Sequence, residues 1–153
     1  MNAIAQKYTD DDVGSIFLYT HEAHPGENYP HHTSFEQKLR HAQALHDEYG
    51  VTRPIWVDAL TGDCHRAYGS MPNMTWVFNR GGIPVYKSDW TDAHSVDSAV
   101  AYYLSASQRR KNGARLAPFK VERVDYRDAD RDAFFAGLAR SGPKAVKEFK
   151  EAF

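Results

Sequence analysis

A capped helix constrains the fold of this chain more than any other stretch of its sequence. Thr33 and Ser34 are each followed three residues later by a Glu or Gln, which makes two overlapping capping boxes. Apolar residues then recur at helical spacing until Gly50, and glycine is the residue type that most often ends a helix. The pattern predicts a helix that begins after Ser34 and ends at Gly50.

Short apolar runs rich in strand-forming residues lie on both sides of this helix. Ile16–Tyr19 precedes it, and Pro54–Asp58 follows it and ends in a carboxylate. Two further β-rich runs, Thr75–Asn79 and Ile83–Lys87, are separated by a Gly-Gly turn and predict a hairpin. Pro84 favours an edge position for the second strand of the hairpin, because proline has no N–H to donate to a neighbour.

Three helices and one strand are predicted after the hairpin. A long helix runs from Ser95 to a basic last turn just before Gly113. The pattern then predicts a strand at Phe119–Tyr126, a short helix at Asp130–Leu138 and a final helix that begins at Pro143. We expect this C-terminal part to cover a sheet edge or a groove.

The order of these elements predicts an α/β fold. Strand, capped helix, strand, hairpin and helix follow one another as in the second half of a thioredoxin-like three-layer sandwich, which has a mixed sheet between helices. We therefore expect residues 1–112 to form this domain, incomplete on its N-terminal side. Residues 113–153 are expected to form a strand and helical extension that packs on it.

Composition and charge exclude several classes of partner. The 153 residues carry a formal charge of −1, so no strong field gathers nucleic acid or an anionic membrane surface. No apolar run approaches the roughly 20 residues of a membrane span, and the acidic stretch Met1–Asp12 is unlike a secretory signal. The single cysteine, Cys64, excludes an internal disulfide and any Cys-x-x-Cys motif. We expect a cytoplasmic protein that binds neither nucleic acid nor membranes.

A histidine-rich loop follows the first predicted strand. It holds His21, His24, His31 and His32, four of the eight histidines, together with Glu22. Ligands of open α/β sheets bind beyond the carboxyl ends of strands. This loop is therefore where a functional site is expected.

Within the loop, His24, His32 and Glu22 are predicted to be catalytic. A carboxylate with two imidazoles suits proton transfer to or from a substrate. His32 lies just before the start of a helix, whose positive end favours a neutral imidazole near pH 7. The alternative is that these histidines are solvated and make structural hydrogen bonds only.

A metal centre is a second and more specific alternative to catalytic histidines. Imidazoles and carboxylates suit zinc and iron, and three ligands could come from the four loop histidines, Glu22 and Asp58. The spacing matches no helical His-x-x-x-His pattern, however, and on a strand His21 and His24 would point to opposite faces. We therefore expect no metal and no cofactor beyond a thiol reductant, and zinc or iron belong to the alternative.

Two other polar residues are expected to have structural roles. Cys64 is followed by His65, but side chains adjacent in sequence seldom face each other, so a small, partly buried residue is expected there and not a nucleophile. Asp58 is expected to cap a turn and to take no part in catalysis.

Several short stretches resemble one family. They are Glu22-Ala23-His24-Pro25, Pro30-His31-His32, Val57-Asp58, Ala67-Tyr68-Gly69 and the hairpin Trp76–Tyr86. Over about residues 1–104 the chain resembles the iodothyronine deiodinases and their bacterial deiodinase-like relatives among the redoxins. The Glu-Ala-His-Pro stretch is the most specific part of this resemblance.

The resemblance implies roles for individual residues. In the family, the histidines that match His24 and His32 are assigned substrate contact and assistance to proton transfer. Pro72 falls where a thioredoxin-like fold places a cis-proline beside its active site. Together with Tyr68 and His31, Pro72 is expected to bind substrate.

The nucleophile of that family has no counterpart in this chain. In deiodinases a strand leads to a Cys or selenocysteine at the start of the next helix, and both are absent here. The strand would lie centrally, between the Ile16 and Thr75 strands. Each backbone group left buried without a partner costs about 1–3 kcal/mol.

Three hypotheses account for the missing strand. A UGA codon for selenocysteine has been read as a stop upstream of an internal Met, another polypeptide donates the strand, or the sheet is rearranged for new chemistry. The DNA upstream of Met1 separates them, because the first hypothesis requires an apolar strand followed by Cys or UGA in frame.

The sequence therefore predicts a deiodinase-like redoxin oxidoreductase domain whose intact form uses a thiol or selenol on a small-molecule substrate. The expected partner is a second copy of the chain or a strand-donating polypeptide. Two alternatives stay open: a cysteine-independent enzyme that uses the His/Glu loop, with or without a metal, and a non-catalytic binding module on a thioredoxin scaffold. The substrate itself is open among halogenated compounds, peroxides, disulfides and other sulfur compounds.

Overall fold

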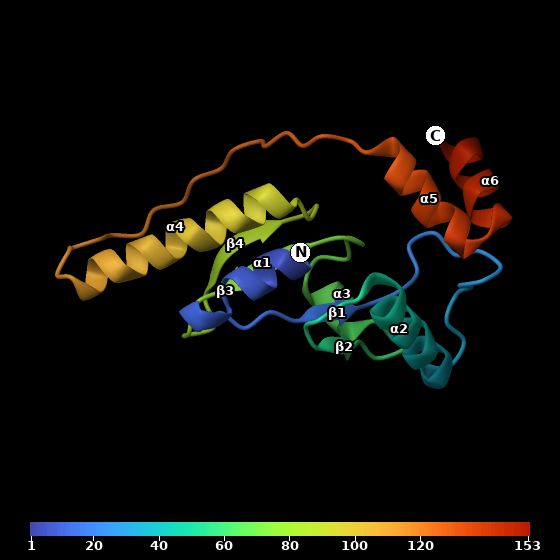
Figure 1. Ribbon diagram of the computed structural model, residues 1–153, viewed down its shortest axis with the longest axis horizontal. Coiled ribbons are helices and arrows are strands. Elements are labelled where there is room, and N and C mark those ends of the chain that lie inside the picture. Colours follow the sequence, from blue (N-terminus) through green and yellow to red (C-terminus); the bar gives the residue numbers. More distant parts are fainter. The chain divides into compact units, whose positions relative to one another are not determined.

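The structure, a computed structural model, describes residues 1–153 and has a mixed α/β fold. The chain forms two compact units, each built from separate stretches (Figure 1). Unit 1 contains residues 3–14 and 73–127, with Met1, and unit 2 contains residues 15–72 and 128–153, with Asn2. The predicted boundary between residues 112 and 113 falls inside the continuous 73–127 stretch of unit 1.

Unit 1 is a helix packed on a hairpin. Its elements are α1 (Asn2–Lys7), the short 3-10 helix η1 (Thr9–Asp11), β3 (Thr75–Phe78), β4 (Pro84–Ser88) and α4 (Ala93–Lys111). The predicted hairpin is confirmed: β3 and β4 are antiparallel, with Val77 opposite Tyr86. Figure 1 shows α4 along this hairpin, and Val96 and Val100 of α4 form the core with Tyr8.

The predicted strand at Phe119–Tyr126 is wrong. This stretch carries no secondary structure, and the side chains of Phe119 and Tyr126 are 79% and 94% exposed. A strand is held by hydrogen bonds to a neighbouring strand, and no strand pairs with this stretch. Strand-forming residues alone therefore did not produce a strand.

Unit 2 contains a parallel strand–helix–strand arrangement. Its elements are β1 (Phe17–Tyr19), α2 (Phe35–Tyr49), β2 (Ile55–Val57), α3 (Asp63–Ala67), α5 (Arg131–Ser141) and α6 (Pro143–Ala152). β1 and β2 pair in parallel, with Tyr19 opposite Val57. The strands, α2 and the two C-terminal helices all lie where the sequence placed them, to within a few residues.

The predicted ends of α2 are confirmed, with Ser34 as the N-cap and Gly50 at the C-terminus. Ser34 Oγ accepts a hydrogen bond from the Gln37 backbone N–H at 3.2 Å, and Gln37 Oε1 accepts one from the Thr33 N–H at 2.8 Å. The helix ends at Gly50, whose φ of 55° lies in the left-handed region that glycine adopts without steric cost. These local interactions fix where α2 begins and ends.

The four strands form two separate two-stranded sheets, one in each unit, and no single mixed sheet. β1 pairs only with β2 and β3 only with β4, so each strand has one unpaired edge. All peptide bonds are trans, including the bond that precedes Pro72. None of the helices is both long enough and apolar enough to cross a membrane.

Candidate functional site

The loop over residues 20–34 joins β1 to α2 and has two parts with different surroundings. Glu22 and His32 turn inward to a small buried group of polar side chains. The stretch from His24 to Asn28 instead contacts the C-terminal helices α5 and α6. The predicted catalytic residues are therefore divided between two places within unit 2.

Four side chains meet around one carboxylate oxygen, and we call them the Glu22 cluster: Tyr19, Glu22, His32 and His41. The Tyr19 hydroxyl donates a hydrogen bond to Glu22 Oε1. The same oxygen lies 3.4 Å from His41 Nδ1 and 3.8 Å from His32 Nε2. The Tyr19 hydroxyl is also 3.3 Å from His32 Nε2. The four groups thus form a continuous set of polar contacts.

Each member of the cluster comes from a different structural context. Tyr19 is the last residue of β1 and is 7% exposed. His32 lies two residues before the N-cap Ser34, and His41 comes from the middle of α2. Side-chain exposures of 5% for His32, 11% for His41 and 19% for Glu22 place the cluster largely out of water.

Burial shifts the pKa values of two members of the cluster, His32 and Tyr19. Loss of hydration, with a smaller contribution from neighbouring His41, lowers the pKa of His32 to about 4. Burial and the hydrogen bond to Glu22 raise the pKa of Tyr19. Near pH 7 the His32 ring is therefore neutral, in the direction expected, but burial and not the helix end is the main cause.

The cluster is better suited to transferring a proton than to holding one. A neutral His32 can accept a hydrogen bond or a proton, and its low pKa means that it would give a proton up readily. The Tyr19 hydroxyl lies within hydrogen-bond distance of both Glu22 Oε1 and His32 Nε2, so it connects these two groups.

His41 is the member that the sequence did not identify. It lies in the predicted helix, three residues after Lys38 and directly before Ala42, the two buried residues of α2. The available signal was the position of His41 in the sequence. It lies next to buried residues of a helix, and that helix follows the histidine-rich loop. Tyr19 was similarly recognised only as a strand residue.

His24 lies away from the cluster, against aromatic rings of the C-terminal helices. Its ring centroid is 5.9 Å from that of Phe134 and 5.5 Å from that of Phe149, both close to perpendicular. Edge-to-face contacts of this kind stabilise packing. His24 therefore contacts these rings and not the cluster, and the structure joins only Glu22 and His32 of the predicted catalytic set.

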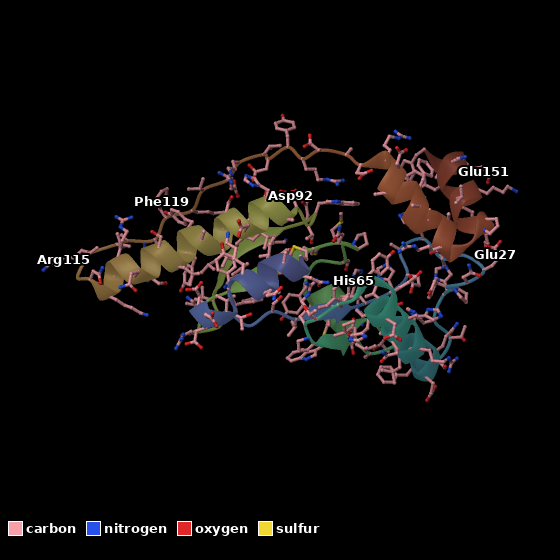
Figure 2. All side chains as sticks on the ribbon, in the orientation of Figure 1. Glu27, His65, Asp92, Arg115, Phe119 and Glu151 are labelled. Atoms are coloured by element: carbon pink, nitrogen blue, oxygen red, sulfur yellow. The ribbon has the colours of Figure 1, made fainter.

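The loop beside His24 is held by the turn between α5 and α6. The Asn28 N–H donates to the Ser141 carbonyl oxygen at 3.0 Å, and the Lys144 N–H donates to Glu27 Oε2 at 3.0 Å. Figure 2 shows Glu27 beside this turn. A carboxylate at a helix N-terminus binds an otherwise unpaired N–H and is favoured by the helix dipole. The helices α5 and α6 therefore pack on the histidine loop.

The three predicted substrate-binding residues lie on the surface, outside the cluster. His31 and Pro72 are exposed, and Tyr68 follows the last residue of α3 with an exposure of 39%. His21, a neighbour of Glu22 in sequence, packs against His65 of α3 with ring centroids 4.4 Å apart. The loop histidines are therefore spread over several surroundings.

Asp58 caps α3, as the sequence predicted. Its two carboxylate oxygens accept hydrogen bonds from the Cys64 and His65 backbone N–H groups, at 3.0 and 2.9 Å. Burial opposes ionisation of Asp58, but these N–H donors prevail and its pKa lies below the usual range. Close by, Lys38 is 2% exposed and donates to the Ala59 carbonyl oxygen at 3.0 Å.

Cys64 is exposed and not partly buried as expected, because it lies in the first turn of the short helix α3. Local loss of hydration and the nearby Asp58 carboxylate raise the pKa of its thiol. A nucleophilic cysteine needs a lowered pKa, since the thiolate is the reactive form. The environment of Cys64 therefore disfavours the thiolate form that a nucleophile needs.

No protein-family model, curated protein or solved structure matches this chain. The buried Glu22 cluster is the arrangement in unit 2 that brings ionisable side chains from a strand, a loop and a helix to one point. It is therefore the candidate functional site.

Proposed function

We propose that the Glu22 cluster is the acid–base part of a deiodinase-like redoxin site, which reduces a small molecule at the expense of thiols. The observation that carries this proposal is that a phenol and two imidazoles lie around one carboxylate oxygen of Glu22, a side chain that is 19% exposed. Side chains within hydrogen-bond reach of one another are what proton transfer during catalysis requires. Glu22 and His32 also belong to the stretches that resemble the deiodinases.

The nucleophile of the proposed reaction is supplied from outside residues 1–153. The only cysteine is Cys64, and its raised pKa argues against a thiolate there. A small thiol, or a thiol or selenol on another polypeptide segment, would attack the substrate. The Glu22 cluster would deliver or remove the proton that accompanies this attack.

A thioredoxin-like arrangement belongs to the same proposal. The parallel β1–α2–β2 segment and the antiparallel β3–β4 hairpin are the kinds of element that such a fold contains. β1 and β3 each keep one unpaired edge, which offers backbone donors and acceptors to a further strand. A second copy of the chain or another polypeptide is proposed to supply it.

The proposal is tested with a small thiol as nucleophile and reductant. The full chain is mixed with dithiothreitol and, in turn, with an iodinated phenol, a hydroperoxide and a disulfide. Reduction of the iodinated phenol releases iodide and places a proton on carbon, while two thiol groups become a disulfide. Iodide release, peroxide loss and disulfide loss are measured against the reaction of the thiol alone.

The variant Glu22→Gln separates catalysis by the cluster from other effects. It keeps the shape of the side chain but removes its charge, and loss of acid–base catalysis costs about 10²-fold or more in rate. The matched control is His46→Gln, because His46 is on the same helix α2 with a side chain that is 52% exposed. The proposal fails if the wild-type chain accelerates none of the three reactions, or if Glu22→Gln is as active as the wild type.

A further inference from the structure

Three ligand-type atoms from separate stretches of unit 2 converge in the Glu22 cluster. A carboxylate oxygen of Glu22 and one ring nitrogen each of His32 and His41 all lie within 4.8 Å of one another. Two imidazoles and one carboxylate form a common protein ligand set for zinc. The loop histidines alone do not provide this set, because His41 comes from the middle of α2.

Two of the three separations between these atoms are close to those of a tetrahedral zinc site, and the third is within 4.8 Å. Zinc–nitrogen and zinc–oxygen bonds of about 2.0–2.1 Å place tetrahedral ligand atoms about 3.3 Å apart. Glu22 Oε1 lies 3.4 Å from His41 Nδ1 and 3.8 Å from His32 Nε2.

One ring nitrogen of the Glu22 cluster is buried without a hydrogen-bond partner. His41 Nδ1 is buried and has no hydrogen-bond partner, although Glu22 Oε1 lies at 3.4 Å. A buried polar atom without a partner costs about 1–3 kcal/mol. Coordination of a cation by this nitrogen would remove that cost, since the lone pair would then have a partner.

A second shell is also present. The Tyr19 hydroxyl donates to Glu22 Oε1 and so holds the carboxylate in its orientation. Hydrogen bonds of this kind to ligand side chains orient them for a metal. The side-chain exposures of 5–19% leave the three ligands largely shielded from water but not sealed.

We propose that Glu22, His32 and His41 bind a zinc ion, with the fourth position taken by water or another small ligand. The proposal stands on the ligand geometry and does not rest on the proposed oxidoreductase activity. Zinc would use the same lone pairs that move protons in the metal-free cluster. Bound zinc is therefore expected to inhibit that activity where it exists.

Metal binding is measured on the full chain, expressed without a histidine tag and dialysed against a chelator. Zinc is titrated by calorimetry, and cobalt is added as a spectroscopic substitute. We expect one ion per chain and the intense visible absorption of tetrahedral cobalt. No binding, or the weak spectrum of octahedral cobalt, would overturn the proposal.

Variants identify the ligands. Loss of a second-shell partner weakens metal binding about 10–100-fold, so loss of a ligand in His41→Gln is expected to weaken it at least about 100-fold. His46→Gln on the same helix and His24→Gln in the same loop should bind as the wild type does. Retained binding in His41→Gln, or loss in His24→Gln, would contradict the assignment.

A variant that does not fold also loses metal binding, so the ligands are identified on the wild-type chain as well. Zinc should change the ring signals of His32 and His41 in nuclear magnetic resonance spectra and leave those of His46 unchanged. Changes confined to exposed histidines would overturn the proposal. Because no substrate is present in these experiments, zinc binding and oxidoreductase activity succeed or fail separately.

Discussion

At the scale of single residues, the Tyr19 hydroxyl organises the carboxylate on which the candidate site depends. Tyr19 is 7% exposed, so its hydrogen bond to Glu22 Oε1 is shielded from water. Tyr19→Phe removes this donor and should lower the free energy of unfolding by about 1–2 kcal/mol, measured by urea denaturation. Tyr102→Phe is the control, because Tyr102 is 71% exposed and its change should stay within about 0.5 kcal/mol. Equal effects of the two substitutions would show that the Tyr19 hydrogen bond contributes nothing.

A second residue-scale prediction concerns the cap of α3. Asp58→Asn replaces a carboxylate that accepts two backbone N–H groups, and loss of such a cap should cost about 1–2 kcal/mol at pH 7. Asp63→Asn, in the same short helix with a side chain 68% exposed, should cost less than about 0.5 kcal/mol.

The sign of the pH dependence follows from the lowered pKa of Asp58. The folded pKa is below the unfolded value of about 3.9, so the stabilisation is complete above that value and is lost as the pH falls through the folded pKa. The difference between wild type and Asp58→Asn should therefore shrink in urea denaturation at pH 3. A difference that stays constant from pH 7 to pH 3 would contradict the assignment.

Residue patterns predicted part of the candidate site. Glu22 and His32 were identified because they follow a strand and precede a helix. His41 and Tyr19 were not, because their roles depend on which sides of a helix and a strand face the loop. His24 lies in the same histidine-rich loop as His32, but its contacts are with Phe134 and Phe149 of the C-terminal helices. Local sequence does not indicate contacts with residues more than a hundred positions away.

At the scale of elements, the close approach of the loop to the α5–α6 turn gives a sharp prediction. A Cβ atom at Gly26 would overlap the backbone carbonyl group of Ser141. Gly26→Ala should therefore cost about 1–3 kcal/mol, as overpacking commonly does, and should reduce hydrogen-exchange protection in α5 and α6.

The control for that substitution lies in the same helical pair. Gly137 is inside α5, and a Cβ atom there would meet nothing within 4 Å. Gly137→Ala should stabilise the chain by up to about 1 kcal/mol, because alanine favours helix more than glycine does. If Gly26→Ala is as harmless as Gly137→Ala, the C-terminal helices do not pack on the loop as described.

Helices whose ends are fixed by capping residues were predicted to within a few residues. The strand predicted at Phe119–Tyr126, which has no neighbouring strand to pair with, was wrong. The capping residues around α2, and Asp92 and Asp130 at the starts of α4 and α5, fix the helix boundaries through contacts within a few residues. The stretch Phe119–Tyr126 has strand-forming residues, but a strand depends on a neighbour that local sequence does not specify.

At the scale of the whole molecule, each unit has buried residues of its own. Val100 belongs to the core of unit 1 with Tyr8 and Val96, and Leu138 is buried in unit 2. Val100→Ala should cost about 2 kcal/mol through lost burial and a small cavity. Native-state hydrogen exchange should show the loss of protection in α4 and the hairpin, with α2 retaining its protection. An equal loss in α2 would show that the two units open together.

The mixed α/β character was predictable from the alternation of strand and helix patterns. The number of sheets was not, because strand pairing joins residues far apart in the chain. Two sheets of two strands, each with unpaired edges, are the observed outcome.

The central claim is that Glu22, His32 and His41 form one buried polar cluster, and the pKa of His32 tests it most directly. The imidazole of His32 is followed by nitrogen-15 magnetic resonance on the metal-free full chain from pH 3 to pH 8. Burial in the cluster predicts a midpoint of about 4 and a neutral ring throughout the range above pH 5. A midpoint near 6.5, the ordinary value of a solvated histidine, would contradict the claim.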